Sequence, residues 1–356
     1  MLRVGMLTSG GDCQALNAAM RGVAKSLFKK CENVEIYGFE DGYKGLINGK
    51  YRLMKCDDFS GVLNRGGTIL GTSRMPFKHI NEPMKDGRDK VESMIETYKN
   101  IELDCLVVLG GNGSHKTANL LQERGLNIIT LPKTIDNDLY GTEVSFGFQS
   151  AIDIATNAID CIHTTAASHS RVFIVELMGH KTGWLTLHAG IAGGADVILI
   201  PERPYNIDVV CEAIDERTKG GKYFTIIVVA EGAISSKEAA LDKKELKQRR
   251  KKQKFPSAAY RVGDEIAKKT GQEVRVTVPG HVQRGGAPDA YDRVLATRLG
   301  VEAANLILKE KYGYMVCLKD NQIDEIPLNE VAGKTKMIDL SDELIKQAED
   351  LGICLG

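Results

Sequence analysis

Residues 104–124 read DCLVVLGGNGSHKTANLLQER, and residues 127–138 continue with NIITLPKTIDND. The run DCLVVL predicts a buried strand, the double glycine predicts a tight turn, and residues 114–124 have the pattern of a helix. A second short apolar run, NIITL, predicts the next strand. A strand, a helix and a strand in this order are typical of a parallel sheet with helices on its faces.

The same alternation continues in both directions along the chain. Strands are expected at 3–8, 34–39, 171–177, 196–200, 223–230 and 273–278. Helices are expected at 14–30, 88–99, 149–165, 182–192, 207–218 and 257–270. The chain has 356 residues, and at roughly 150 residues per domain this length suits about two domains. We therefore expect an α/β protein with two doubly wound, mostly parallel-sheet domains.

The composition excludes several classes of protein. Hydrophobic residues make up 43% of the chain, which is ordinary for a globular protein and excludes wholesale disorder. Lys and Arg together number 47, as do Asp and Glu, so the net charge is zero and a nucleic-acid partner is not expected. The longest apolar runs are too short for a membrane-spanning helix, and no signal peptide is recognised. Eight scattered cysteines without a CxxC pair suit reduced thiols, and we expect a cytoplasmic protein.

One segment, residues 237–254, is polar and rich in Lys and Arg. Its charge would suit an anion or a partner, but a solvated helix between the neighbouring elements is the favoured interpretation.

Several predicted strands end in glycine or polar residues, as in SGGD (9–12), GGNGS (110–114) and PGHVQRGG (279–286). Ligands of open parallel sheets bind outside the carboxyl ends of the strands, and glycine turns before a helix expose N–H groups to phosphate. Neither GxxxxGK[ST] nor GxGxxG occurs, which argues against a Walker-type nucleotidase and a standard dinucleotide oxidoreductase. These features favour a phosphate-handling enzyme.

The run TIDND at 134–138 places two carboxylates two residues apart after a strand. One carboxylate can accept a proton from a substrate hydroxyl while the other faces a metal ion. A turn stabilised by Asx side chains explains the five residues equally well.

Seven longer motifs occur together, in the order LTSGGD, NAAMRGV, NRGGTILGTSR, VVLGGNGS, PKTIDND, SHSRVFIVELMGHKTGWLTLHAGIAGGADVILIPE and VPGHVQRGGAPDAYDR. With these motifs the sequence resembles the phosphofructokinase family over about residues 3–300. The resemblance implies a homo-oligomeric, cytoplasmic kinase of glycolysis, a transferase that uses ATP and Mg²⁺ to phosphorylate fructose 6-phosphate at its 1-hydroxyl. It implies an active site in the cleft between two domains. The implied domains are a donor-binding domain at 1–147 plus about 285–335, a sugar-phosphate-binding domain at 148–284 and a C-terminal extension at 336–356.

On the donor side, the resemblance implies that Asp136 is the catalytic base and that Thr134 contacts the transferred phosphoryl group and the sugar. Arg74 is implied to bridge the donor phosphates, and the N–H of Gly11 to stabilise the transferred phosphoryl group. The implied donor-binding residues are Gly11, Arg74, Gly111, Asn112, Gly113, Ser114 and Lys133. The implied metal-binding residues are Asp138 and Asn112.

On the sugar side, the resemblance implies that Met178, Gly179 and His180 contact the sugar and that Glu231 binds its hydroxyls. His281 and Arg284 are implied to hold the 6-phosphate. The remaining residues, Arg171 and Arg275, correspond to arginines that reach the 6-phosphate from a neighbouring subunit. We therefore expect a homodimer or homotetramer.

The sequence departs from the family pattern in four respects. Asn112 stands where an Asp is usual, and His180 stands where an Arg is frequent. Lys133 is typical of pyrophosphate-using members, whereas Gly113 is typical of ATP-using members. In the effector site of bacterial relatives only Arg21 is kept, with Lys25 and His163 in place of arginines.

We expect ATP to be the donor, because Gly113 leaves room for the nucleotide, and a pyrophosphate-dependent, reversible enzyme is the alternative. A non-catalytic sugar-phosphate-binding subunit is a further alternative. We also expect His115, next to the GGNGS turn, to be a solvated residue at a helix N-terminus rather than a phosphate contact.

Overall fold

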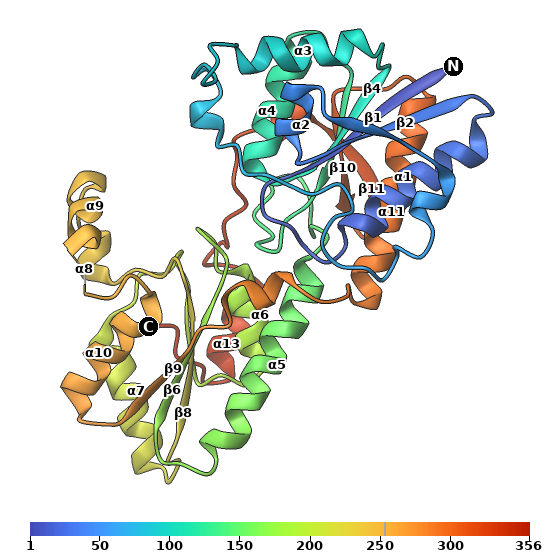
Figure 1. The fold of residues 1–356 in the computed structure, drawn as a ribbon. Coiled ribbons are helices and arrows are strands. Elements are labelled where there is room, and N and C mark those ends of the chain that lie inside the picture. Colours follow the sequence, from blue (N-terminus) through green and yellow to red (C-terminus); the bar gives the residue numbers. More distant parts are fainter. Residues whose placement is uncertain (253) are drawn as a thin grey trace. The chain divides into compact units, whose positions relative to one another are not determined.

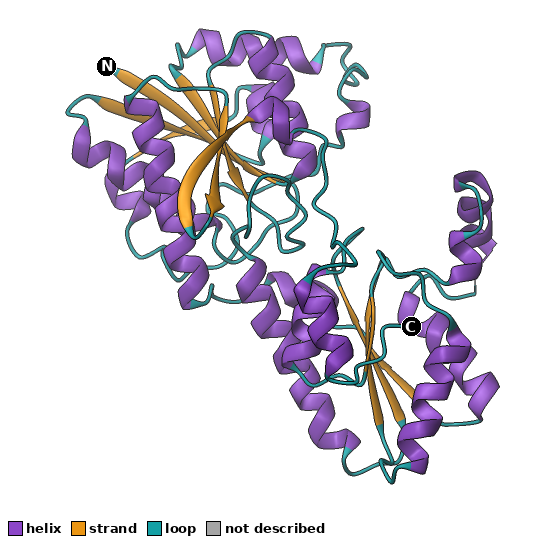
Figure 2. Cartoon of the chain, turned by 180° about the vertical axis from the view of Figure 1, so that it is seen from behind, coloured by secondary structure: helices purple, strands orange, loops and turns teal. Residues whose placement is uncertain are grey.

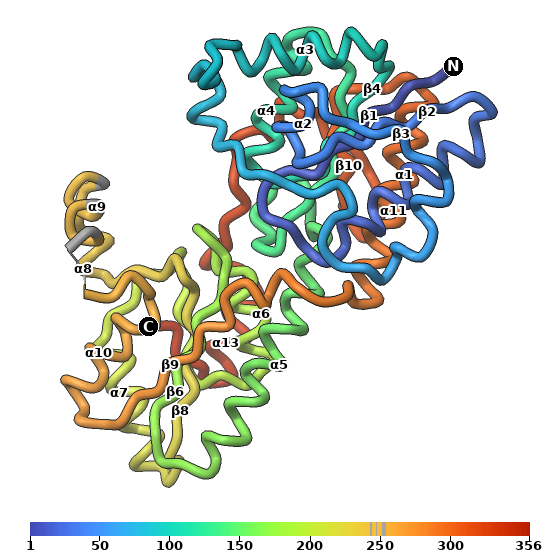
Figure 3. The backbone as a smooth tube through the Cα atoms, viewed as in Figure 1, coloured from blue at the N-terminus to red at the C-terminus, as the bar shows by residue number. Residues whose placement is uncertain are grey.

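The computed structural model describes residues 1–252 and 254–356, and within this range it leaves the side chains of Lys243, Lys247, Lys251 and Lys252 undescribed. The described chain divides into two compact units. Unit 1 contains Met1–Ser150 and Arg284–Lys336, and unit 2 contains Ala151–Gln283 and Met337–Gly356. The orange part of the backbone in Figure 3 shows residues from near 300 returning to the sheet that the blue N-terminal part begins.

Unit 1 is built on a seven-stranded sheet with the order β11-β10-β5-β4-β1-β2-β3. Its strands are β1 (Leu2–Ser9), β2 (Val34–Phe39), β3 (Tyr51–Met54), β4 (Cys105–Gly110), β5 (Ile128–Pro132), β10 (Tyr314–Lys319) and β11 (Gln322–Pro327). The five central strands are parallel, and the two outer strands β3 and β11 run antiparallel to their neighbours. The predicted parallel sheet is therefore confirmed for this unit.

Helices cover both faces of this sheet (Figure 1). They are α1 (Leu16–Lys30), α2 (Tyr43–Asn48), α3 (Lys90–Asn100), α4 (Asn112–Glu123), α11 (Ala290–Leu308) and α12 (Leu328–Val331). The apolar faces of α2, α3 and α4 pack with Leu7, Leu106 and Val108 of the sheet into one core cluster. Helices α1 and α11 lie side by side on the other face (Figure 2).

Unit 2 has a fully parallel four-stranded sheet with the order β7-β8-β6-β9. Its strands are β6 (Val172–Leu177), β7 (Val197–Leu199), β8 (Thr225–Ala230) and β9 (Val274–Thr277). Its helices are α6 (Trp184–Ala192), α7 (Ile207–Lys219), α8 (Ser236–Ala239), α9 (Lys243–Lys252), α10 (Ala258–Thr270) and α13 (Glu343–Asp350). Helix α5 (Phe148–Ala166) starts in unit 1 and continues in unit 2. Helices α7 and α10 pack on one face of the sheet, where Val210 and Val262 contact the core.

The structure contains several elements that were not expected from the sequence, among them the helices α2, α11, α12 and α13. The strands β3, β10 and β11 were not expected from the sequence, because they are short edge strands or parts of a hairpin. The C-terminal segment expected as an extension at 336–356 clusters with unit 2 from Met337 onward, and Cys354 pairs with Val197 beside β7. The basic segment 237–254 contains α8 and α9, with Gln253 outside the described residues. None of the helices within the described ranges is long and apolar enough to span a bilayer.

Candidate active site

The turn after β1 contains two glycines, Gly10 and Gly11, whose lack of side chains leaves the backbone accessible. Gly10 has a φ of +86°, in the region that favours glycine. A Cβ added at Gly11 would lie 2.8 Å from a guanidinium nitrogen of Arg284, and that nitrogen donates to the carbonyl of Asp12 at 2.9 Å. A side chain at position 11 would have to displace this guanidinium, so glycine lets the turn present backbone and positive charge together. Such a turn suits an anion.

The loop that carries Arg74 is hydrogen-bonded to the same turn. The N–H of Gly10 donates to the carbonyl of Ser73 at 3.1 Å, and the hydroxyl of Thr72 donates to the carbonyl of Gly10 at 2.7 Å. Arg74 directly follows these contacts and is exposed. The loop thus adds a second guanidinium near the turn after β1.

The end of β4 and the start of α4 form a close strand-to-helix connection. A Cβ at Gly110 would lie 2.2 Å from the Cβ of Ser114, which explains the glycine there. A Cβ at Gly113 would meet nothing within 4 Å. The first N–H groups of a helix lack intrahelical partners, and here they begin a helix of 12 residues. The exposed side of Gly113 therefore offers an anion-binding helix end with free space beside it.

His115 is buried, which corrects the expectation of a solvated histidine. It is 0% exposed, and its Nδ1 lies 2.9 Å from the carbonyl oxygen of Gly111. Burial lowers the pKa of His115 to about 4, and the ammonium group of Lys133 acts in the same direction. The helix turn points this side chain into the core, so His115 is a neutral packing residue.

Lys133 connects the end of β5 with the glycine turn after β1. Its ammonium group donates to the carbonyl of Gly11, and its backbone N–H donates to the carbonyl of Gly110 at 3.1 Å. The residue is only 3% exposed, and burial lowers the pKa of its side chain. Lys133 is thus a buried cation at the ends of β1, β4 and β5, and its charge suits the binding of a phosphate group.

The TIDND run forms a hydrogen-bonded turn. The N–H of Asp136 donates to the hydroxyl of Thr134 at 3.0 Å. Asn137 has a φ of +50°, and its amide oxygen accepts from the N–H of Ser145 at 3.0 Å. The hydroxyl of Ser145 donates to the carbonyl of Thr134 at 2.8 Å. The turn is therefore stabilised by the hydroxyl of Thr134 and by the contact of Asn137 with the more distant Ser145, not by the Asx turn that the sequence allowed, and it holds the half-buried Asp136 in a fixed backbone.

Asp138 and Asn112 are the residues expected to bind metal. The amide nitrogen of Asn112 donates to the carbonyl of Lys334 at 2.7 Å, and its amide oxygen is buried without a hydrogen-bond partner in the described chain. Asp138 is half-buried. The backbone carbonyl of Asp138 accepts a hydrogen bond from the backbone N–H of Lys336 at 2.9 Å. No group of three His, Cys, Asp or Glu side chains suited to a metal occurs within residues 1–252 and 254–356. One carboxylate and one amide oxygen suit Mg²⁺, which takes its remaining ligands from phosphates and water.

In unit 2, the expected sugar contacts gather at the ends of β6 and β8. The backbone N–H of His180 donates to the carboxylate of Glu231 at 2.8 Å. A Cβ at Gly232 would lie 2.2 Å from the carbonyl oxygen of His180, so the two strand ends touch through their backbones. Gly179 has a φ of +147°. The half-buried Met178 donates its N–H to the amide oxygen of the buried Gln283 at 3.1 Å.

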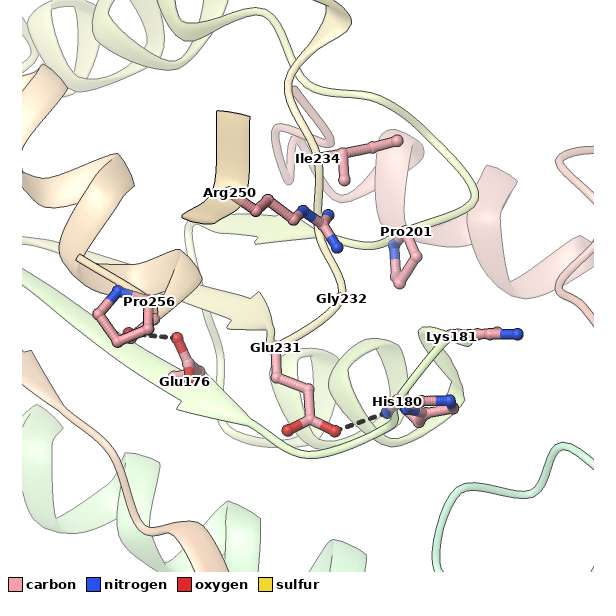
Figure 4. Close-up of a pocket in the computed structure, with 10 residues that line it drawn as sticks. Glu176, His180, Lys181, Pro201, Glu231, Gly232, Ile234, Arg250 and Pro256 are labelled. Carbon is pink, nitrogen blue, oxygen red and sulfur yellow. Dashed lines mark hydrogen bonds between the residues drawn. The ribbon is translucent and has the colours of Figure 1, made fainter. Parts of the chain in front are cut away.

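These strand ends border a pocket of about 620 Å³, shown in Figure 4. Its lining residues are Glu176, His180, Lys181, Pro201, Glu231, Gly232, Ile234, Arg250, Pro256 and Ser257. Sequence reasoning did not identify Arg250, because it lies in the basic segment 237–254 and no motif includes it. A polar pocket at the carboxyl ends of parallel strands is the usual place for a ligand.

The remaining arginines expected at the sugar site lie at the start of β6 and in β9. Arg171 and Arg275 both form ion pairs with Glu273 in the same chain. These two positive charges lower the pKa of Glu273, with the Arg171 contact as the largest cause. The structure thus groups the two arginines around a carboxylate that sequence reasoning missed. His281 is exposed in unit 2, whereas Arg284 belongs to unit 1.

The family model described as Phosphofructokinase matches residues 3–307. The chain is 54% identical over 355 residues to the ATP-dependent 6-phosphofructokinase of Spirochaeta thermophila, covering 99% of this chain and 97% of that protein. It is 45% identical to the ATP-dependent 6-phosphofructokinase 3 of Bacteroides thetaiotaomicron, covering 100% of both proteins.

Two solved structures have the same fold. Pichia pastoris phosphofructokinase in the T-state matches with a TM-score of 0.79 and 34% identity, covering 93% of this chain and 35% of the longer Pichia chain. A pyrophosphate-dependent phosphofructokinase of Marinobacter aquaeolei matches with a TM-score of 0.79 at 22% identity, covering 100% of this chain and 89% of that chain. The family model, the curated relatives and the shared fold agree, and the chain belongs to the phosphofructokinase family.

Proposed function

We propose that this protein is an ATP-dependent 6-phosphofructokinase of glycolysis, which transfers the terminal phosphoryl group of ATP to the 1-hydroxyl of fructose 6-phosphate. The proposal rests on one observation: relatives that share 43–54% of their residues with this chain are named ATP-dependent 6-phosphofructokinases. The open space beside Gly113 supports ATP as the donor, because no side chain there obstructs a nucleotide.

The proposed chemistry assigns one role to each strand end of unit 1. The carboxylate of Asp136 accepts the proton of the 1-hydroxyl while that oxygen attacks the terminal phosphorus, and ADP leaves. Thr134 contacts the reacting groups, and the N–H of Gly11 donates to the transferred phosphoryl group. Phosphoryl transfer needs positioning and charge neutralisation more than covalent chemistry, and the hydrogen-bonded turn of Asp136 supplies such positioning.

The donor phosphates require positive charge, which we assign to Arg74 and Lys133. Gly111, Asn112, Gly113 and Ser114 at the start of α4 bind the same phosphates, and the N–H groups before Ser114 are the ones without helical partners. A kinase of this family needs a divalent metal, and we propose that it is Mg²⁺, held by Asp138 and the buried amide oxygen of Asn112. When bound, Mg²⁺ neutralises charge on the donor phosphates.

For the sugar phosphate we propose Met178, Gly179, His180 and Glu231 as contacts of the sugar. His281 and Arg284 then hold the 6-phosphate. We further propose that Arg171 and Arg275 reach the 6-phosphate in a neighbouring subunit, which makes the protein an obligate homo-oligomer. Glycolysis draws on the ATP of the cytoplasm, and we propose that location for the protein.

A pyrophosphate-dependent reaction remains the second candidate, because the buried Lys133 adds charge beside the transferred group for either donor. The test is kcat/KM for ATP and for pyrophosphate, measured at saturating fructose 6-phosphate and Mg²⁺. We expect the higher value for ATP. A higher value for pyrophosphate would assign the second function, and no turnover with either donor would favour a non-catalytic binding subunit.

A further inference from the structure

A short segment at the C-terminal end of unit 1, residues 334–336, contacts the side chain of Asn112. We call this segment the strap, and it lies between α12 and the point where the chain enters unit 2. The amide nitrogen of Asn112 donates to the carbonyl of Lys334 at 2.7 Å and to the hydroxyl of Thr335 at 3.2 Å. The resemblance seen in the sequence covers only about residues 3–300, so it assigns no role to the strap.

The strap is held in place by a second segment of unit 1, residues 138–143. The backbone N–H of Lys336 donates to the backbone carbonyl of Asp138 at 2.9 Å. The ammonium group of Lys336 donates to the carbonyls of Thr142 and Glu143 at 2.9 and 2.7 Å. The acceptors that the strap offers to the asparagine amide are therefore fixed by contacts elsewhere in unit 1.

These contacts decide which way the amide group of Asn112 is turned. A backbone carbonyl oxygen can only accept hydrogen bonds, so the atom beside the carbonyl of Lys334 must be the amide nitrogen. The amide oxygen then lies on the other side of the group, where it is buried without a hydrogen-bond partner in the ranges 1–252 and 254–356. An unpaired buried acceptor is costly, and a cation beside it removes that cost.

The strap also gives a physical reason for the absence of the family's usual Asp at position 112. A carboxylate there would place an acceptor oxygen beside the carbonyl oxygen of Lys334, where the amide nitrogen now lies at 2.7 Å. Two acceptors at this distance repel each other, whereas the amide nitrogen of Asn112 donates. The amide and the strap therefore match each other.

We propose that the strap is a positioning element of the donor site, in which Thr335 is a positioning residue that turns the amide oxygen of Asn112 toward the divalent metal on the donor phosphates. This inference rests on the proposed function, since it takes ATP and Mg²⁺ as the ligands of unit 1. Thr335 acts through Asn112 and does not touch the reacting atoms. Its removal therefore changes how donor binding depends on the Mg²⁺ concentration.

The test compares Thr335→Val, Thr335→Ser, Asn112→Asp and Asn48→Asp with the unmodified protein. Asn48→Asp is the matched charge control, because the amide of Asn48 also donates to a carbonyl, that of Lys44 at 2.8 Å, but is exposed to water. The first measurement is the Kd of ATP at several Mg²⁺ concentrations, without fructose 6-phosphate. The others are the hydrogen exchange rate of the Lys336 N–H and steady-state kinetics.

Thr335→Val keeps the shape of the side chain but removes one of the two acceptors of the amide. We expect the Mg²⁺ concentration for half-maximal ATP binding to rise about 3- to 10-fold, as is typical for the loss of one hydrogen bond. Saturating Mg²⁺ should recover kcat, and the KM for fructose 6-phosphate should not change. Thr335→Ser retains the hydroxyl and should restore the Mg²⁺ dependence of the unmodified protein.

Asn112→Asp tests the match between the amide and the strap. We expect weaker ATP binding at every Mg²⁺ concentration, although a carboxylate would otherwise favour the metal. The exchange of the Lys336 N–H should become about 10-fold faster, because the repelled strap separates more often from Asp138. Asn48→Asp should change neither quantity.

ATP binding by Asn112→Asp that is as tight as in the unmodified protein would overturn the inference, as would an unchanged Mg²⁺ dependence in Thr335→Val. Both outcomes leave the proposed function intact, because the unmodified protein still uses ATP. An unmodified protein that neither binds ATP with Mg²⁺ nor turns it over would overturn the proposed function itself, and the role of Thr335 with it.

Discussion

At the scale of single residues, the side chain of Lys133 connects segments that lie far apart in sequence. It follows β5, yet its ammonium group donates to the carbonyl of Gly11 after β1. Its burial costs desolvation, which lowers its pKa, and the nearby Cys13, Asp136 and Asp138 act in the opposite direction. The strand ends of unit 1 therefore form one charged surface around the turn of Asp136.

The first prediction concerns Asp136, the proposed base. Asp136→Asn keeps the shape of the side chain and the N–H contact with Thr134, but the amide accepts a proton poorly. We expect kcat to fall by about 10²- to 10⁴-fold, with little change in the Kd of fructose 6-phosphate. Asp138→Asn serves as the comparison, since its loss of activity should be reduced by raising the Mg²⁺ concentration. Turnover of Asp136→Asn within threefold of the unmodified protein would exclude Asp136 as the base.

The second prediction concerns donor choice at Gly113. A Cβ added there meets no protein atom within 4 Å, so we expect Gly113→Asp to fold normally. Its carboxylate would occupy the space beside the start of α4 and repel the α-phosphate of ATP. We expect kcat/KM to fall much more for ATP than for pyrophosphate, and Gly113→Ala to have the smaller effect. An equal loss of kcat/KM for ATP and for pyrophosphate would show that the nucleotide does not bind beside Gly113.

At the scale of elements, helices α1 and α11 pack closely because glycine occurs at their contact. A Cβ at Gly300 would lie 2.3 Å from the carbonyl oxygen of Ala19, and a Cβ at Gly22 would lie 2.7 Å from that of Thr297. These backbone atoms cannot move aside as the end of a flexible side chain can. The close approach fixes how α11, from the C-terminal part of the chain, joins the core of unit 1.

The third prediction follows from this contact. Gly300→Ala should lower the free energy of unfolding by about 1–3 kcal/mol, because the added methyl group forces the two helices apart. Gly113→Ala adds the same group to a helix position with open space, where alanine favours the helix. Denaturant unfolding of both variants measures the difference. A Gly300→Ala variant as stable as the unmodified protein would refute the packing argument.

Asp292, in the first turn of α11, joins that helix to the start of α5. Its carboxylate accepts from the N–H of Gly147 at 3.0 Å and from the N–H and hydroxyl of Ser150 at 2.9 and 2.6 Å. Burial raises the pKa of Asp292 from 3.8 to about 6. The folded protein therefore binds this proton more tightly than the unfolded chain does.

The fourth prediction is a pH dependence. An acid with a raised pKa contributes stability that is complete below its unfolded pKa and is lost as the pH rises through its folded pKa. For Asp292 that window runs from 3.8 to about 6. Because Asp292→Asn does not titrate, its stability relative to the unmodified protein should improve as the pH rises across this window. Unfolding curves at several pH values test this, with the exposed Asp57→Asn as a charge control. A difference in the free energy of unfolding between Asp292→Asn and the unmodified protein that stays constant with pH would contradict this prediction.

At the scale of the whole molecule, the two units each present glycine-rich or polar strand ends, and the proposed sites for donor and sugar divide between them. The ion pairs of Arg171 and Arg275 with Glu273 keep two guanidinium groups together in unit 2. A phosphate dianion can replace one carboxylate as their partner. We propose that the 6-phosphate bound by a second copy of the chain takes this place.

The fifth prediction tests that arrangement by mixing one variant with weakened substrate binding and one variant without turnover. Arg171→Ala should weaken fructose 6-phosphate binding, and Asp136→Asn should abolish turnover. If each site takes Asp136 from one chain and Arg171 from another, a hybrid oligomer contains intact sites. Random mixing into dimers should then recover about a quarter of the activity of the unmodified protein. Activity no higher than the sum of the unmixed variants, in hybrids shown to form, would place both residues in the same site of one chain.

The α/β class, the parallel strands other than β10 and the membership of the phosphofructokinase family could all be predicted from the sequence. Buried strands are continuous apolar runs and the glycine turns that follow them are local patterns, so both can be read from neighbouring residues. The hairpin of β10 and β11 was missed although Asp320 and Asn321, with φ values of +49° and +58°, are typical turn residues. Its strands alternate weakly in burial, and their place depends on pairing β10 with β5.

Which groups meet and which are buried depends on the tertiary structure. It placed His115 in the core, gave Arg171 and Arg275 a shared carboxylate, and brought Arg250 to the pocket of Glu231. The physical reason is that burial and charge pairing depend on contacts between segments far apart in the chain. The local sequence around His115 or Arg250 specifies a helix, but the side of that helix that faces a neighbour depends on how the helix packs against the rest of its unit.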